Sequence, residues 1–208
     1  MRKLRLAAAI LCLVLLAGVM SQTADYIEAR EMQQEIAGKI LRFHVLANSD
    51  SDEDQALKLK VRDAVGSKMS SLLKNVTDIE ECKQITTDHM KEIVETARDT
   101  ITENGYDYPV EAYIKDVEFP DKTYGEYTFP SGMYDALEVI IGAGAGHNWW
   151  CVMYPNMCFA GTTYEVVEDH AKESLQSTLT QKEYESLMEK KDYKIQCKYL
   201  KFLNKYLD

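Results

Sequence analysis

A histidine and two cysteines lie close together in the sequence around residue 150. His147 and Cys151 are four positions apart, and Cys158 follows in the same stretch. A cysteine nucleophile needs a base and a third group that orients the base, and spacing alone supplies neither. In an exported protein the two cysteines favour a Cys151–Cys158 disulfide. We assign no catalytic residue, and a secreted thiol-dependent hydrolase remains the alternative.

Acidic and amide side chains alternate between residues 48 and 54, as at the start of a calcium loop. An EF-hand loop needs glycine at its sixth position and glutamate at its twelfth. Counted from Asp50, those positions hold Gln55 and Val61. We therefore interpret the acidic residues as the start of a helix, where the helix dipole favours negative charge. No metal and no cofactor is predicted.

Three alternating glycines, Gly142, Gly144 and Gly146, could suggest a loop that cradles phosphate. A P-loop continues with lysine and a hydroxyl residue, whereas this stretch continues with His147 and Asn148. The glycines are interpreted as a flexible or tightly turning connection.

Trp149 and Trp150 are the most distinctive pair in the chain. Adjacent residues of an extended strand point to opposite faces, so the two indoles are expected to separate, one inward and one outward. Tryptophan is enriched at interface hot spots. We therefore predict that Asn148, Trp149 and Trp150 form a partner-binding segment. An extracytoplasmic module that binds a small ligand is a further alternative.

The periodicity of the chain predicts the elements that position these residues. Alternation over 40–47 predicts a strand with Arg42 and His44 on its polar face. Two helices follow, the second opening with a capping box at residues 77–80 and ending at Asn104-Gly105. Segments 110–115 and 137–141 alternate as strands, with a hairpin around Tyr124-Gly125 between them.

Helical periodicity returns after Glu165, with a second capping box at residues 180–183, and residues 193–199 alternate as a late strand. These elements predict an α+β domain: a mostly antiparallel sheet packed with a two-helix pair, plus C-terminal helices and the late strand. Cys82 and Cys197 fall on apolar faces and are expected in the core, with pairing between them left open.

The N-terminus predicts the compartment. Three basic residues precede fifteen apolar residues, Leu6 to Met20, which is typical of a signal peptide and short for a spanning helix. We assign residues 1–24 to a signal peptide or anchor, 25–38 to a polar lead-in and 39–208 to one domain. Without residues 1–24 the net charge falls from −10 to −13, which argues against nucleic acid as a partner.

Three stretches of the sequence resemble the stage II sporulation protein R family. They are residues 41–52 with 54–55 and 60–65; Phe119-Pro120, Lys122, Tyr124-Gly125, Pro130, Gly132 and Tyr134; and Gly142, Gly144, Gly146, 148–152, Pro155 and Cys158-Phe159. Beyond about residue 160 no motif of the family is recognised.

This resemblance implies a non-enzymatic intercellular signal of endospore formation. It implies export across the forespore membrane into the space between forespore and mother cell. It also implies a partner, a membrane-embedded aspartic protease that removes the pro-sequence of the mother-cell sigma factor. If the signal is not cleaved, the protein stays tethered to the membrane.

The Cys151–Cys158 disulfide is testable on the exported protein. Non-reducing peptide mapping should recover a linked peptide containing both cysteines. On the chain-entropy estimate, so short a closed loop stabilises the fold by about 2.5 kcal/mol. Two free thiols in protein taken from an oxidising compartment would contradict the pairing and favour the thiol-enzyme alternative.

Overall fold

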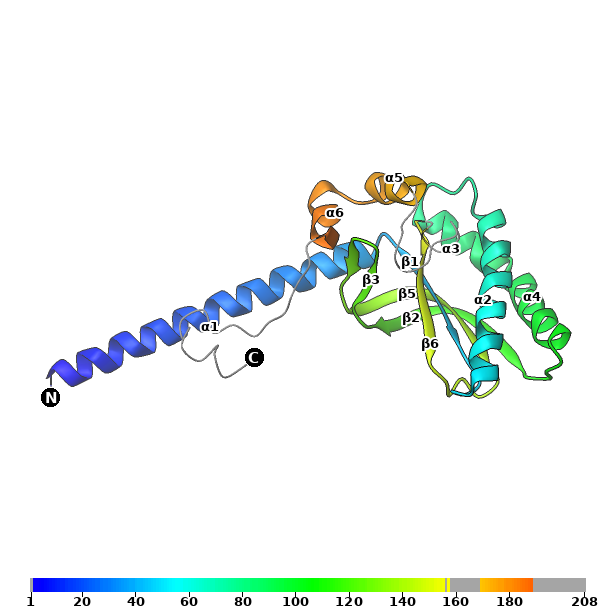
Figure 1. The fold of residues 1–208 in the computed structure, drawn as a ribbon. Coiled ribbons are helices and arrows are strands. Elements are labelled where there is room, and N and C mark those ends of the chain that lie inside the picture. The colour runs from blue at the N-terminus through cyan, green and yellow to red at the C-terminus, as the bar shows by residue number, and fades with distance from the viewer. Residues whose placement is uncertain (1, 156, 158–168, 189–208) are drawn as a thin grey trace.

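The computed structural model describes residues 2–155, 157 and 169–188, without the side chains of 2–12, 169 and 170. A long first helix projects from one side of a sheet domain (Figure 1). The elements in chain order are α1 (Arg2–Ala37), β1 (Leu41–Leu46), α2 (Asp52–Leu72), α3 (Ile79–Asp88), α4 (Met90–Glu103), β2 (Val110–Phe119), β3 (Lys122–Tyr124), β4 (Tyr127–Phe129), β5 (Gly132–Ile141), β6 (Asn148–Tyr154), α5 (Asp169–Thr178) and α6 (Gln181–Met188).

Four strands form the main sheet in the order β2-β5-β1-β6, and β3 pairs with β4 in a separate hairpin. β1 runs parallel to β5, whereas the β2–β5 and β1–β6 pairs are antiparallel. The fold is therefore α+β with a mixed, mostly antiparallel sheet, as predicted. The predicted late strand at 193–199 and the tail after it lie outside the described residues.

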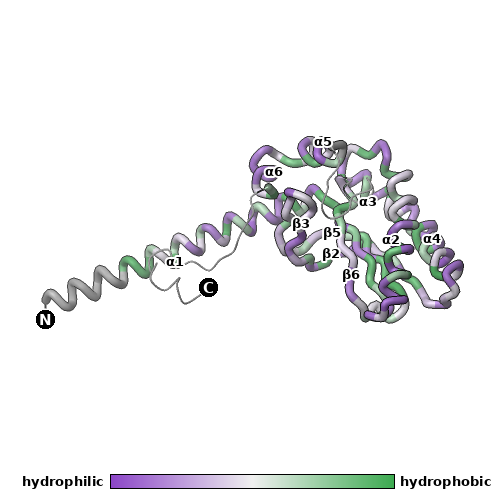
Figure 2. Tube along the Cα trace, in the orientation of Figure 1, coloured by the Kyte–Doolittle hydropathy of each residue, from purple (hydrophilic) through white to green (hydrophobic). Residues whose placement is uncertain are grey.

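The sheet is covered on both faces, which we call the helical face and the hairpin face. Apolar residues of α2, α3 and α4 pack on the helical face around Phe43, Val45 and Val139. The end of α1, the β3–β4 hairpin, α5 and α6 pack on the hairpin face around Phe119 and Tyr134. Figure 2 shows hydrophobic stretches along the strands of the sheet, between these two layers.

Two helix boundaries differ from the sequence prediction. The helix expected from Thr77 to Asn104-Gly105 is two helices, with His89 capping the end of α3 and the start of α4. The residue that caps α3 is Asp78, whose side chain accepts a hydrogen bond from the Glu81 amide. The capping box therefore predicted the start of α3 to within one residue. The one-residue error arises because neighbouring hydroxyl and acidic residues can each serve as the cap there.

Other local predictions are confirmed. Gly105 ends α4 with φ +85°, the left-handed conformation that glycine adopts without strain. At α6, the Thr180 amide donates to Glu183 Oε2 at 2.6 Å and the Glu183 amide donates to Thr180 Oγ1 at 3.4 Å, which is a capping box. Gly125, with φ +58°, makes the turn between β3 and β4.

α1 is continuous through the boundary expected between the signal segment and the lead-in. Its last turns belong to the packed domain: Met32 and Ile36 are buried, and the Gln33 amide group donates to the Met133 carbonyl at 3.0 Å. Upstream of these turns, the large apolar side chains described from residue 13 onward are exposed, as Leu13, Met20 and Tyr26 illustrate. In the described part of the chain, no helix combines the length and hydrophobicity needed to cross a bilayer.

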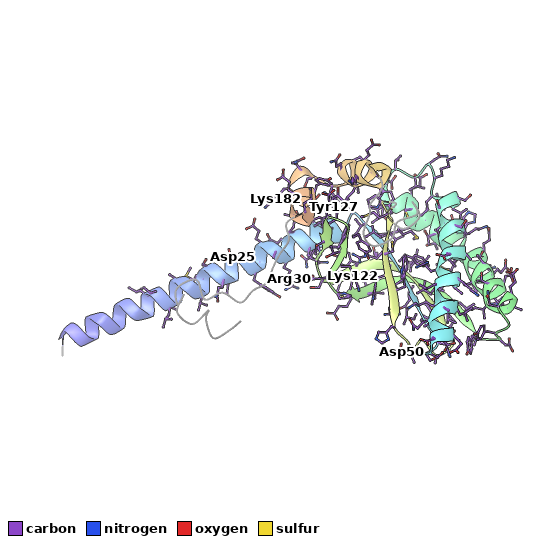
Figure 3. All side chains as sticks on the ribbon, in the orientation of Figure 1. Asp25, Arg30, Asp50, Lys122, Tyr127 and Lys182 are labelled. Atoms are coloured by element: carbon purple, nitrogen blue, oxygen red, sulfur yellow. The ribbon has the colours of Figure 1, made fainter. Side chains whose placement is uncertain are left out.

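The end of α1 is held by α6. Lys39 Nζ pairs with both carboxylate oxygens of Glu183 at 2.7 Å, and Glu183 is almost fully buried. Lys182 reaches Glu28 on α1 at 2.9 Å (Figure 3). The predicted lead-in therefore contributes core residues and is not only a spacer.

A matched pair of substitutions tests this role of α1. Ile36→Ala removes a fully buried side chain and should lower the free energy of unfolding by about 2–4 kcal/mol. Ile27→Ala, on the exposed part of the same helix, should change it by less than about 0.5 kcal/mol. Urea denaturation of both variants measures the difference, and equal losses would contradict the packing of α1 against the hairpin face.

Candidate functional site

The two tryptophans lie on β6, an edge strand of the sheet, and point to opposite faces. Trp149 packs on the helical face, edge-on to Phe43 at 5.8 Å between ring centroids. The Arg62 guanidinium lies 4.9 Å from the centre of the Trp149 ring. Both tryptophans are half-buried, so the expectation of one inward and one outward indole is wrong. Because both faces of the sheet carry packed layers, each indole is partly covered and partly open to solvent.

Trp150 belongs to an aromatic layer on the hairpin face. It stacks on His44 with ring centroids 4.9 Å apart and planes 11° apart, and it meets Phe119 at 4.6 Å. The Tyr124 hydroxyl donates to the Trp150 carbonyl at 3.0 Å. β1 and β2 thus contact the ring of this residue, and the hairpin binds its backbone.

Arg42 sits in the middle of this layer and is fully buried. Its Nε donates to the Cys151 carbonyl at 3.1 Å, and its Nη2 donates to the Tyr124 hydroxyl at 3.3 Å. Burial lowers the pKa of Arg42. Four aromatic rings surround its guanidinium at 4.3–5.9 Å, from Phe119, Tyr124, Phe129 and Tyr134.

The aromatic box takes the place of a carboxylate partner for this cation. The negative faces of aromatic rings attract a guanidinium, and more strongly where water is excluded. No ion pair of Arg42 is found among the described residues. The polar face of β1 is therefore an interior face.

His44, the other polar residue of β1, is also buried. Its Nε2 lies 3.1 Å from Glu138 Oε1, but the two groups are not aligned as a hydrogen bond. We therefore treat the contact as electrostatic. Lys115 pairs with the other carboxylate oxygen of Glu138. Burial, followed by the nearby charges of Lys115 and Arg42, lowers the pKa of His44 to about 4.

The sequence did not identify this layer as a unit. Arg42 and His44 alternate with apolar residues on a strand, a pattern that normally means a solvated face. The sequence feature that could have revealed this layer is the density of aromatic residues between 119 and 134, which is enough to cover a second face of the sheet.

The glycine loop after β5 is tightly packed against the segment after β1. Every backbone amide from Gly142 to His147 donates a hydrogen bond within the protein. Three of these bonds go to Asn48 or Asp50: Ala143 to Asn48 Oδ1, Ala145 to Asn48 O and His147 to Asp50 Oδ1. The amides that would have to bind phosphate are occupied, so the loop is a tight connection and not a flexible one.

Two of the loop glycines show how close this approach is. A Cβ on Gly142, which has φ +57°, would overlap the Asn48 side chain. A Cβ on Gly146 would overlap the Ser49 backbone carbonyl, which cannot move away as a side chain could. Glycine is therefore required here by the close contact between the two loops.

The acidic residues after β1 serve the start of α2. Ser51 caps the helix by accepting from the Asp54 amide, and Asp54 itself accepts from Asn48 and Ser49 side chains. These hydrogen bonds lower the pKa of Asp54. No cluster of His, Cys, Asp and Glu that could hold a metal occurs among the described residues.

His147 and Cys151 are not brought together. The His147 ring is exposed and bonds Asp50 through Nδ1 at 2.5 Å, at the far end of the sheet from Tyr127 and Lys182 (Figure 3). Cys151 is buried within the sheet opposite Phe43 of β1. Asp50 orients the His147 imidazole, but Cys151, the residue that this base would have to activate, does not contact it.

The cysteines separate into two kinds. Cys82 is free and buried on α3, and burial raises its pKa to about 12, so it is an inert core residue as expected. Cys151 is disulfide-bonded, and its partner lies outside the described residues. Cys158 and Cys197 also lie outside them, so the Cys151–Cys158 pairing stays a prediction.

Burial of His44 predicts acid sensitivity. The unfolded chain binds a proton at this residue near pH 6.5, whereas the folded protein binds it only near pH 4. Stability should therefore fall as the pH drops through this window, by about 3 kcal/mol from this residue. His44→Gln should flatten this part of the stability–pH curve, measured by urea denaturation at several pH values. An unchanged slope would contradict the assignment.

Comparison with known proteins identifies the family. A family model described as Stage II sporulation protein R matches residues 37–164. The chain is 32% identical over 181 residues to the Stage II sporulation protein R of Bacillus subtilis (strain 168), covering 85% of this chain and 81% of that protein. No solved structure matches. The chain belongs to the stage II sporulation protein R family.

Proposed function

We propose that this chain is a secreted, non-enzymatic signal of endospore formation. In this proposal it activates a membrane-embedded aspartic protease that processes the mother-cell sigma-factor precursor. The observation that carries the proposal is membership of the sporulation family over most of the chain. The acidic surface suits a protein partner better than a nucleic acid.

The proposed location is the space between forespore and mother cell. It is supported by the basic start and the apolar run from Leu6 to Met20. The packing of Met32 and Ile36 sets a limit on any processing, because a cut beyond residue 31 would remove core residues. Fractionation of sporulating cells with mass spectrometry of the N-terminus tests both points.

We propose the partner contact at the Asn148-Trp149-Trp150 segment. The segment lies on an edge strand, beside the exposed Asp50–His147 pair. Its two half-buried indoles are held rigidly, Trp149 between Phe43 and Arg62 and Trp150 on His44. Rigid aromatic side chains bind at low entropic cost, which is why they often dominate interfaces.

A thiol-dependent hydrolase is less well supported. The separation of His147 from Cys151 removes the base–nucleophile contact that the mechanism needs. Peptide mapping of the proposed Cys151–Cys158 disulfide bears directly on this alternative, since an oxidised Cys151 is no nucleophile.

The activation assay combines the purified exported protein with membranes that hold the protease and the unprocessed sigma factor. Trp149→Ala and Trp150→Ala should each cost about 2 kcal/mol of folding stability, less than a fully buried tryptophan, and still give folded protein. At equal folded concentration, loss of a hot-spot indole should weaken activation by about thirtyfold. Immunoblots of precursor processing measure this effect.

Tyr106→Ala is the matched control. Tyr106 is also a half-buried aromatic residue, but it lies between α4 and β2 and stacks on Tyr108. Its loss should lower stability without changing activation. If both tryptophan variants activate as well as this control, the contact lies elsewhere on the domain. If the unaltered protein triggers no processing at all, the proposed function itself fails.

A further inference from the structure

β2, at the opposite edge of the sheet from β6, has an open outer side in the described fold. It pairs with β5 over all ten of its residues, from Val110 opposite Ile141 to Phe119 opposite Gly132. Among residues 2–155, 157 and 169–188, no strand pairs with its other side. A regular edge of this length is a template on which a further strand can form.

The register identifies the backbone groups of β2 that point outward. The Gly142 amide donates to the Pro109 carbonyl at 2.8 Å, and these two residues continue the β2–β5 register by one step. Hydrogen-bonded and open pairs alternate along an antiparallel ladder. The residues whose amide and carbonyl groups point away from β5 are therefore Val110, Ala112, Ile114, Asp116 and Glu118.

Several usual protections of an edge strand are missing from β2. It contains no proline, and its pairing with β5 runs without a bulge, unlike the shifted register between β1 and β6. Its lysine, Lys115, pairs with the buried Glu138 on β5 instead of guarding the edge. The outward donors and acceptors are therefore not blocked by the strand itself.

The outward positions near the end of β2 are acidic. Asp116 and Glu118 are exposed, on the same face of the strand as the buried Val110. Asp116 lies opposite Asp135 of β5, and a hydrogen bond between the two carboxyl groups raises the pKa of Asp116. Lys83 pairs with Asp135 at 2.6 Å. A cation placed beside Asp116 would offset the repulsion between these neighbouring carboxylates.

The hairpin face of the same edge carries an aromatic side chain. Tyr113 is 44% exposed, and its hydroxyl donates to Glu111 Oε2 at 2.6 Å. Val117, on the same face, is half-buried. Tyrosine is enriched among interface hot spots. A strand lying along β2 would cover this apolar surface with apolar side chains of its own.

We propose that the outer edge of β2 binds an extended segment of a partner protein as a fifth strand of the main sheet. The segment carries basic residues two positions apart, which face Asp116 and Glu118. Its apolar residues alternate with the basic ones and cover Tyr113 and Val117. Backbone hydrogen bonds supply affinity in this mode of binding, and the side chains supply selectivity.

The charge of the chain favours a basic partner over a second copy. Another molecule of this protein would bring further acidic side chains to the edge, from a chain of net charge −10. Like charges opposite one another destabilise strand pairing, and net charge opposes self-association. The surface lies across the sheet from Trp149 and Trp150, so the proposal does not depend on the proposed activation contact.

Hydrogen exchange of the full chain with a synthetic peptide tests the proposal. The probe is a short peptide in which valine alternates with lysine, at up to millimolar concentration. At saturation, the outward amides of β2 should exchange on the order of tenfold more slowly, because a second neighbouring strand now binds them. A peptide in which glutamate replaces lysine should bind at least about tenfold more weakly.

The charge-reversal variant D116K/E118K makes the result specific. It should lose the preference for the lysine peptide and bind the glutamate peptide instead. E53K/D63K is the matched control, because it changes the net charge equally on α2, beside the other edge of the sheet. This control should keep the preference for the lysine peptide to within about twofold.

Ile114→Pro tests the backbone contribution. Its amide points away from β5, so the substitution removes an outward donor without removing a β2–β5 hydrogen bond. Peptide binding should fall by about tenfold relative to Ile114→Ala, which removes the same side chain but keeps the donor. Protected β5 amides show that each variant is folded.

Three results would overturn the proposal. The first is absence of peptide-dependent protection at the outward β2 amides. The second is protection that the lysine and glutamate peptides produce equally, in the unaltered chain and in D116K/E118K alike. The third is protection that rises with protein concentration in the absence of peptide, because it would assign the edge to a second copy of the chain.

Discussion

The fold depends on burying β1 on both of its faces. β1 lies between β5 and β6, with helices on one side and the hairpin layer on the other. One face carries Phe43 and Val45, and the other carries Arg42 and His44. A buried arginine is costly unless its donors are satisfied and its charge is stabilised. The Cys151 and Tyr124 oxygens satisfy Nε and Nη2, Nη1 has no hydrogen-bond partner among the described residues, and the aromatic box stabilises the charge. These contacts tie β1, β6 and the hairpin together.

This constraint explains many of the residues on which the resemblance to the family rests. The stretches around 41–55 and 142–151 lie far apart in sequence but form one junction, in which Asn48 and Asp50 bind the backbone of the glycine loop. Phe119 and Tyr124 belong to the box around Arg42. These residues are therefore explained by folding alone. A recognition surface has to be sought among the exposed or half-buried members of the same stretches, such as His147 and Trp150.

The two ends of the described chain complete the second core. The family match spans residues 37–164, yet Ile36 of α1 and Leu175 and Leu187 of α5 and α6 are fully buried together on the hairpin face. Lys39 and Glu183 join the two ends by an ion pair in which only the glutamate is buried. The cooperative folding unit is thus wider than the matched region. A domain whose second core includes Ile36 near one end and Leu187 near the other can finish folding only after the chain through α6 is available.

The sequence by itself determined the local elements, because their signals are local. Period-two and period-3.6 patterns, the Gly105 helix end and the Thr180–Glu183 capping box all depend on residues within a few positions of one another. The two faces of Trp149 and Trp150 follow from strand geometry in the same way. Only the tertiary structure decided that the Arg42 and His44 face is interior, that β1 runs parallel to β5, and that His147 bonds Asp50 instead of meeting Cys151. These outcomes depend on which distant segments pack on each face of the sheet, and no periodicity within a single segment encodes that choice.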